Sequence, residues 1–96
     1  MTNATTAHVI VRGRVQGVGY RAWIYAEARR RGLRGFVRNR RDGWVEALFA
    51  GDEAAVADMI EACRIGPRLA AVEDIRRLDG ENPPGIPDGF EVWATA

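Results

Sequence analysis

The sequence predicts an α+β fold in which two helices pack on one face of an antiparallel sheet. Two observations lead to this prediction. The chain has 96 residues, the size of one small domain, for which two packed layers are the practical limit. Short β-branched runs alternate along it with two segments of helical composition, in the order βαββαβ with a further short edge strand. Neither helix can bury its apolar stripe except against a shared sheet.

The first half of the chain predicts a strand, a loop and a helix. The β-branched run 8–11 predicts the strand, and a glycine-rich stretch, 13–19, follows it. Residues 21–31 are good or tolerable helix formers. The helix is expected to stop at Gly32, because glycine readily takes the left-handed conformation that ends many helices.

A hairpin and a second helix come next. Residues 33–40 and 44–49 have strand character, and the intervening Asp42-Gly43 supplies turn chemistry. The second helix is expected between Asp52, a good N-cap, and Gly66-Pro67. Its apolar stripe follows the i, i+3, i+4, i+7 spacing and consists of Val56, Met59, Ile60 and Cys63.

The last third predicts two further strands, 70–78 and 90–95, separated by a loop at 82–85. The complete order is that of a ferredoxin-like βαββαβ sandwich. Residues 1–7 are expected to form a flexible N-terminal tail and residues 8–96 a single domain. Because this fold hosts enzymes, RNA binders and regulatory modules alike, the function has to be argued from a site.

Composition excludes several kinds of site. A single cysteine, Cys63, cannot form an internal disulfide, and one histidine, His8, provides neither the number nor the spacing of ligands for a zinc site. We expect ordinary structural roles for both. No apolar run approaches the length of a membrane span, and no signal-peptide core is present at the start. These features favour a cytoplasmic protein without a metal site.

Charge is distributed unevenly along the chain. Residues 1–41 contain ten arginines and one acid, a net charge of +9, whereas residues 42–96 contain four arginines and twelve acids, a net charge of −8. The asymmetry suggests that the first half binds an anion. Solvated arginines that reflect only codon usage are an equally plausible source of most of this charge.

The glycine-rich stretch is the best candidate for an anion site. It runs from Gly13 to Arg21 and joins a strand to a helix N-terminus, where convergent backbone N–H groups and the helix dipole favour a phosphate. Arg21 adds a guanidinium that can contact two phosphate oxygens. The alternative is a turn that merely reverses the chain. Nucleotide motifs do not fit, because the chain has no lysine for a Walker A loop and has Ala22 where a Rossmann fingerprint needs glycine.

The same residues resemble the acylphosphatase family. The segment 11–21 looks like that family's first signature, which runs Gly, any residue, Val, Gln, Gly, Val, any residue, aromatic, Arg. The segment 35–46, with Gly51 downstream, matches the second signature, which contains an aromatic residue, valine, a basic residue and asparagine after its first glycine. Gly66-Pro67, followed by Ala70 and Val72, resembles the family's entry to its fourth strand. The resemblance covers residues 8 to 95.

The resemblance implies hydrolysis of acyl phosphates to a carboxylate and inorganic phosphate by direct attack of water, without metal or cofactor. It assigns phosphate binding to Arg21 together with the loop residues Gln16, Gly17, Val18, Gly19 and Tyr20, and water positioning to Asn39. Tyr20 stands where phenylalanine is commoner in the family, so we expect an additional hydroxyl beside the site. Asn39 is two residues beyond Val37 and is therefore expected on the same face of the sheet.

The expected partners are an acyl phosphate and inorganic phosphate, with no nucleic acid and no membrane, and the chain is expected to be a monomer. Two other functions remain open. An RNA-binding sandwich of the same topology would use the basic first half, although the acidic second half would repel a nucleic-acid backbone. An anion-binding regulatory module would keep the cradle without turnover.

Overall fold

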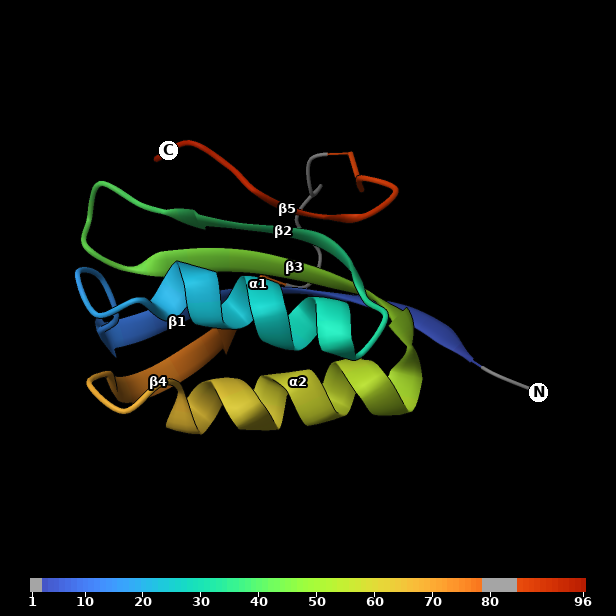
Figure 1. Cartoon of the computed structure of the whole chain (residues 1–96), viewed down its shortest axis with the longest axis horizontal. Helices are drawn as coiled ribbons and strands as arrows, with labels where there is room; N and C mark the ends of the chain where they lie inside the picture. Colours follow the sequence, from blue (N-terminus) through green and yellow to red (C-terminus); the bar gives the residue numbers. More distant parts are fainter. Residues whose placement is uncertain (1–2, 79–84) are drawn as a thin grey trace.

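The computed structural model describes residues 3–78 and 85–96 and confirms the predicted α+β fold (Figure 1). Its elements, in chain order, are β1 (Ala4–Arg14), α1 (Tyr20–Arg30), β2 (Arg34–Asn39), β3 (Val45–Asp52), α2 (Glu53–Ile65), β4 (Ala71–Arg77) and β5 (Phe90–Val92). The predicted order of strands and helices is therefore correct. Of the predicted loop at 82–85, residues 82–84 lie outside the described residues.

The five strands form one sheet in the order β4-β1-β3-β2-β5. The four longer strands pair antiparallel, as predicted, but β5 pairs parallel with β2. The purely antiparallel sheet that we expected is therefore wrong at this edge. β4 runs opposite to β5, so β5 begins at the end of the sheet where β4 stops. From there β5 runs in the same direction as β2, and the two strands pair parallel. β1, β2 and β5 consequently all end at the same end of the molecule.

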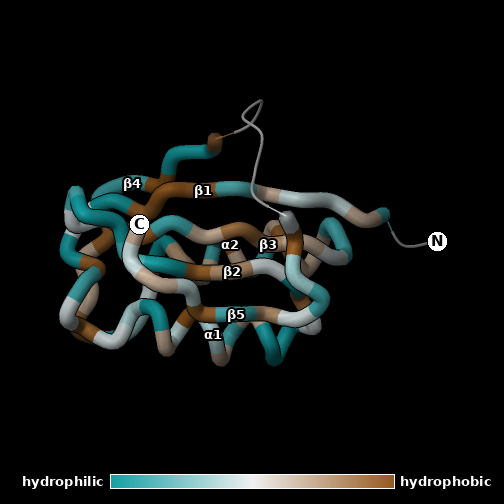
Figure 2. Tube along the Cα trace, turned by 90° about the horizontal axis from the view of Figure 1, so that it is seen from above, coloured by the Kyte–Doolittle hydropathy of each residue, from teal (hydrophilic) through white to brown (hydrophobic). Residues whose placement is uncertain are grey.

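Both helices cover the same face of the sheet, as Figures 1 and 2 show from two directions. Alternate residues of each strand face them, so that Val9, Val37 and Phe49 join the apolar stripes of α1 and α2 in the main core. The opposite face has a smaller cluster around Phe36, whose ring stacks on Trp93 with centroids 3.9 Å apart. No helix in the described part of the chain is both long and apolar enough to cross a membrane.

Of the predicted flexible tail, 1–7, residues 4–7 are strand, while residues 1 and 2 lie outside the described residues. β1 begins at Ala4, and its residues Ala4 to Ala7 pair with Asp52 to Phe49 of β3. The Asn3 carbonyl also accepts a hydrogen bond from the Glu53 N–H at 2.7 Å. The polar composition of the segment suggested a tail, but β3 extends far enough to satisfy its backbone groups, which outweighs weak local propensity.

The second helix has the predicted boundaries and the predicted cap. The Asp52 side chain accepts a hydrogen bond from the Ala55 N–H, and the helix ends at Gly66, which has a φ of 66°. The last strand is shorter than the predicted 90–95, since only Phe90 to Val92 pair as a ladder with β2. Beyond it, two N–H groups of the C-terminal segment still bond to carbonyls of β2.

Candidate active site

The site forms where β1, β2 and β5 end together. The β1–α1 loop starts after Arg14, Asn39 is the last residue of β2, and Val92 is the last residue of β5. A cavity of about 320 Å³ lies between them. It is lined by Val15, Gln16, Gly17, Gly19, Tyr20, Arg21, Ala22, Asn39 and Val92. The structure thus brings together at one cavity every predicted site residue except Val18, whose side chain packs against the main core.

The loop backbone takes the conformation that glycine permits. Gly17 and Gly19 have φ values of 74° and 77°, in the left-handed region, while a Cβ added at either would meet nothing within 4 Å. Glycine is therefore required at both positions for backbone geometry and not for space. Alternation of left-handed and ordinary residues is the geometry that turns successive N–H groups toward one point and makes an anion-binding concavity.

The N-terminus of α1 is left open to an anion. Its N-cap is Gly19, no side chain caps the first turn, and the first turn contains no acid. The other helix of the protein is capped by Asp52 and carries Glu53 in its first turn. The first N–H groups of a helix have no partner within it and lie at the positive end of the dipole. Those of α1 are therefore available to bind an anion, whereas those of α2 are occupied by its own acidic side chains.

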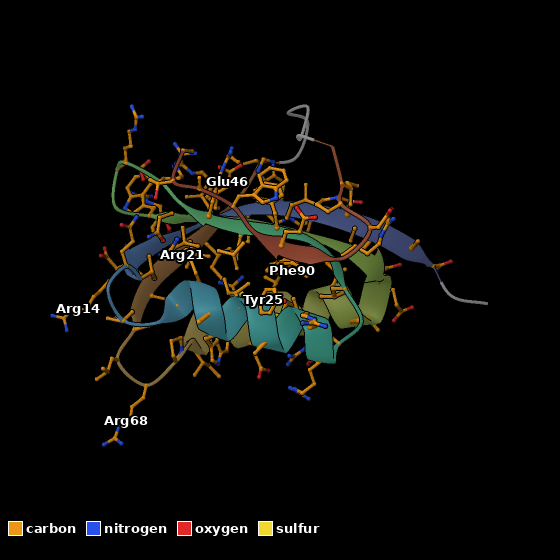
Figure 3. The ribbon with its side chains drawn as sticks, turned by 45° about the horizontal axis from the view of Figure 1, so that its top comes forward. Arg14, Arg21, Tyr25, Glu46, Arg68 and Phe90 are labelled. Carbon is orange, nitrogen blue, oxygen red and sulfur yellow. The ribbon has the colours of Figure 1, made fainter. Side chains whose placement is uncertain are left out.

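Arg21 contributes an uncompensated positive charge to the cavity. The side chain is half-buried at the start of α1, and it makes no ion pair or side-chain hydrogen bond with any residue in the described part of the chain. Arg31, near the other end of the same helix, bonds to both Glu27 and Asp58. Figure 3 shows Arg21 at the end of the molecule where the β1–α1 loop turns. A guanidinium kept free of carboxylates is available for a phosphoryl group.

Asn39 presents an unpaired acceptor at the same cavity. The residue shares a face of the sheet with Val37, as predicted, and this is the helix-covered face, because Val37 is part of the main core. The side-chain Oδ1 is buried and has no hydrogen-bond partner within the described residues. A buried acceptor without a partner costs free energy, so Asn39 Oδ1 is free to accept a hydrogen bond from a molecule in the cavity. The backbone of Asn39 is fixed by the Ala96 N–H, which donates to its carbonyl at 3.0 Å.

Gln16 joins the loop to the strand that carries Asn39. Its Nε2 donates to the carbonyls of Arg40 and Trp44, both at 2.8 Å, on the two sides of the β2–β3 turn. Sequence reasoning placed Gln16 among the phosphate-binding residues, but both side-chain donors are used within the protein, which leaves its backbone N–H for the loop. The side-chain role was missed because its two acceptors are backbone groups 24 and 28 residues away.

The Tyr20 hydroxyl does not lie beside the site, contrary to our expectation. The ring is buried against the turn after α2, where a Cβ on Gly66 would come within 2.7 Å of Tyr20 Cε2. The hydroxyl donates to the Cys63 carbonyl at 2.7 Å and thereby satisfies a carbonyl near the end of α2. Burial raises the Tyr20 pKa far above its ordinary value. The Tyr20 side chain links α1 to α2, and its hydroxyl does not enter the cavity.

The two residues that we expected to be structural are both buried. Burial raises the pKa of the Cys63 thiol to about 12, so the thiol is not a nucleophile at neutral pH. His8 lies on the opposite face of the sheet, where its Nε2 is 2.6 Å from Glu46 Oε2. This partner was not predictable from the sequence alone. Arg38 bonds to the other Glu46 oxygen at 3.0 Å, so the three side chains form a cluster behind the site.

Within the described residues, no three side chains of histidine, cysteine, aspartate or glutamate gather closely enough to hold a metal ion. The residues that line the cavity provide the backbone of the glycine-rich loop and of the first turn of α1, the Arg21 guanidinium and the carboxamides of Gln16 and Asn39. Together they can bind a tetrahedral anion and orient a neutral molecule beside it.

Comparisons with known proteins agree with this arrangement. Residues 7–92 match the acylphosphatase family model. An acylphosphatase of Azorhizobium caulinodans is 58% identical over 90 residues, which cover 94% of this chain and 96% of that protein. The crystal structure of acylphosphatase from Bacillus subtilis has a TM-score of 0.79 and 36% identity, and covers 95% of this chain and 99% of its own. An acylphosphatase structure from Coxiella burnetii has a TM-score of 0.81 and 31% identity, with 95% and 94% covered. The chain therefore belongs to the acylphosphatase family of hydrolases.

Proposed function

We propose that the protein hydrolyses the carboxyl-phosphate bond of acyl phosphates by direct attack of water on phosphorus, without a metal or cofactor. The observation that carries this mechanism is the presence, at one cavity, of an unpaired guanidinium on Arg21 and an unpaired buried oxygen on Asn39. The guanidinium can bind the phosphoryl anion, and the Asn39 oxygen can bind the attacking water.

The phosphoryl group binds in the concavity of the β1–α1 loop. Backbone N–H groups of residues 16–20 donate to its oxygens, and the Arg21 guanidinium adds two charge-assisted hydrogen bonds. These donors are fixed before the substrate arrives, because glycine at 17 and 19 holds the loop and no side chain caps the helix. Preorganised donors of this kind stabilise the charge that spreads over the equatorial phosphoryl oxygens in the transition state.

Asn39 orients the attacking water. Its Oδ1 accepts a hydrogen bond from the water, which turns a lone pair of the water oxygen toward phosphorus. The water oxygen forms the new bond to phosphorus while the bond from phosphorus to the acyl oxygen breaks. The acyl oxygen keeps the bonding electron pair and leaves as a carboxylate, and the proton of the water passes to a phosphoryl oxygen or to solvent. The carboxamide itself is never ionised.

The leaving group explains why no general acid is needed. A carboxylate whose conjugate acid has a pKa of about 4 is a stable anion at neutral pH. An alcohol or alkoxide leaving group would require a proton donor, and the only histidine, His8, lies on the opposite face of the sheet beside Glu46. We therefore expect phosphate monoesters to be poor substrates.

The assay that tests the function is benzoyl phosphate hydrolysis in the presence of EDTA, with wild type compared with Arg21→Gln. We expect full activity of the wild type in EDTA and a loss of about a thousandfold or more in the variant, the range for arginines that stabilise phosphoryl transfer. Arg34→Gln is the matched control, because Arg34 is exposed and unpaired within the described residues and lies at the other end of β2. Retention of most activity in Arg21→Gln, or loss of activity in EDTA, would contradict the proposal.

A further inference from the structure

Two arginines near the cavity have no role in the mechanism above. Arg14 is the last residue of β1, and Val15, which lines the cavity, follows it directly. Arg68 lies in the turn between α2 and β4. Both are exposed, and neither forms an ion pair or side-chain hydrogen bond with any residue that the structure describes. We refer to Arg14 and Arg68 as the cationic rim.

The fold places the two segments that carry the rim residues next to each other and next to the site. Arg14 pairs with Ala71 in the sheet, which brings the end of β1 against the turn that contains Arg68. The same turn packs on Tyr20, one residue before Arg21, since a Cβ on Gly66 would touch the Tyr20 ring. Figure 3 shows Arg14 and Arg68 extending into solvent at the end of the molecule where Arg21 lies.

Some of the other charges at this end are paired, whereas Arg41 in the β2–β3 turn and Glu73, two residues beyond Ala71 in β4, are exposed and have no ion pair within the described residues. In the β2–β3 turn, Arg40 bonds to Asp42 at 2.9 Å, and at the end of α2, Arg64 bonds to Glu61 at 3.2 Å. The first turn of α1 carries no acid. The rim therefore adds a net positive potential outside the loop, in addition to the charge of Arg21 inside it.

The rim arginines are not needed to bind the phosphoryl group. In the proposed mechanism, loop amides and Arg21 already contact the phosphoryl oxygens, and both rim side chains extend into solvent, Arg14 beside the β1–α1 loop and Arg68 from the turn between α2 and β4 (Figure 3). The acyl group leaves on the side opposite the attacking water, so it is the part of the substrate that extends out of the cradle. A negative charge on that acyl group would lie in the field of the rim.

We propose that Arg14 and Arg68 make the site favour acyl phosphates whose acyl group carries its own negative charge over those whose acyl group is neutral. This inference rests on the proposed function and names the substrate class within it. The rim acts through its field on association and on KM and not on the chemical step, as exposed charges at the edge of a site do.

The size of the effect follows from Coulomb's law. Two unit charges on the order of 10 Å from a carboxylate in water change its affinity about threefold at an ionic strength of about 0.01 M. At about 0.5 M salt, screening removes most of this preference. The phosphoryl charge is common to both kinds of substrate, so the ratio of their kcat/KM values isolates the charge of the acyl group.

The test compares succinyl phosphate, which carries an extra carboxylate, with acetyl phosphate, which does not. In the wild type we expect the ratio of kcat/KM for succinyl over acetyl phosphate to fall as salt rises from 0.01 to 0.5 M. In the double variant Arg14→Gln/Arg68→Gln we expect this ratio at low salt to fall about threefold and its salt dependence to flatten. The kcat for acetyl phosphate should stay within twofold of wild type.

The control is Arg34→Gln/Arg76→Gln, which removes the same number of charges from the opposite end of the sheet, where both residues are exposed. This control should keep the wild-type ratio and its salt dependence. An unchanged ratio in the rim variant, or an equal change in the control, would overturn the rim proposal while leaving the proposed function standing. If wild type hydrolyses neither substrate, the proposed function itself fails.

Discussion

Replacement of Gln16 by methionine tests whether one side chain holds the two halves of the site together. Methionine has a similar length and no hydrogen-bond donor, so the change removes both 2.8 Å bonds to the carbonyls of Arg40 and Trp44 while keeping the volume. The loop on one side and the strand end with Asn39 on the other then lose their direct polar link.

The expected cost follows from those two bonds. Each contributes about 0.5–1.5 kcal/mol net, so their joint loss costs about 2 kcal/mol of unfolding free energy. For a domain of this size that corresponds to a fall in melting temperature of roughly 8–16 °C. A shift of about 1 Å between loop and strand end lowers the rate by roughly 100-fold, because the attacking water and the phosphoryl group are no longer aligned.

Thermal unfolding and steady-state hydrolysis of benzoyl phosphate measure the two effects. We expect kcat to fall more than the affinity for inorganic phosphate. In the proposed mechanism the phosphate binds to loop backbone N–H groups and to Arg21, whereas the Gln16 side chain contacts only the hairpin. Arg41→Gln, an exposed substitution in the β2–β3 turn, serves as the control and should leave the melting temperature and kcat close to those of wild type. A Gln16→Met variant with the melting temperature and kcat of wild type would refute the argument.

Two further predictions concern the loop and the cluster behind it. Gly19→Ala and Gly32→Ala both force alanine into the left-handed region, at φ values of 77° and 72° where the added Cβ meets nothing, so each should lose about 1–2 kcal/mol of stability, but only Gly19→Ala should weaken phosphate binding in a calorimetric titration. Equal phosphate affinities in the two variants would contradict the role of the loop. For Glu46, desolvation acts to raise the pKa, but the hydrogen bonds from Arg38 and His8 outweigh it and hold the pKa below its ordinary value. A lowered pKa in the folded state stabilises the protein above the unfolded pKa of about 4.3, and this contribution disappears as the pH falls through the folded value. The difference in melting temperature between wild type and Glu46→Gln should therefore shrink between pH 7 and pH 3, and a difference that stays constant would refute this reading.

Local signals in the sequence were strong enough to predict the order of the elements. Asp42-Gly43 set the hairpin, Asp52 and Gly66 bounded the second helix, and the spacing of Val37 and Asn39 fixed the face on which the asparagine lies. These features depend on neighbours within a few residues, so they are visible without a structure.

Features that depend on distant partners were not predictable in the same way. The N-terminal segment became strand because β3 continues to Asp52, and the Tyr20 hydroxyl turned to a carbonyl of α2 because Gly66 leaves room for its ring. His8 acquired Glu46 as a partner only through the pairing of β1 with β3. In each case the outcome depends on tertiary pairing, which either overrides the local propensity or leaves no signal in the local composition.

The division of labour at the cavity is tested most directly by measuring kcat and the inhibition constant of inorganic phosphate for Asn39→Ala. We expect kcat to fall by about 100-fold or more, as for loss of a single group that acts on the transition state, while the inhibition constant stays within about twofold of wild type. A variant that turns over at nearly the wild-type rate, or one that loses phosphate binding in proportion to its rate, would contradict this expectation.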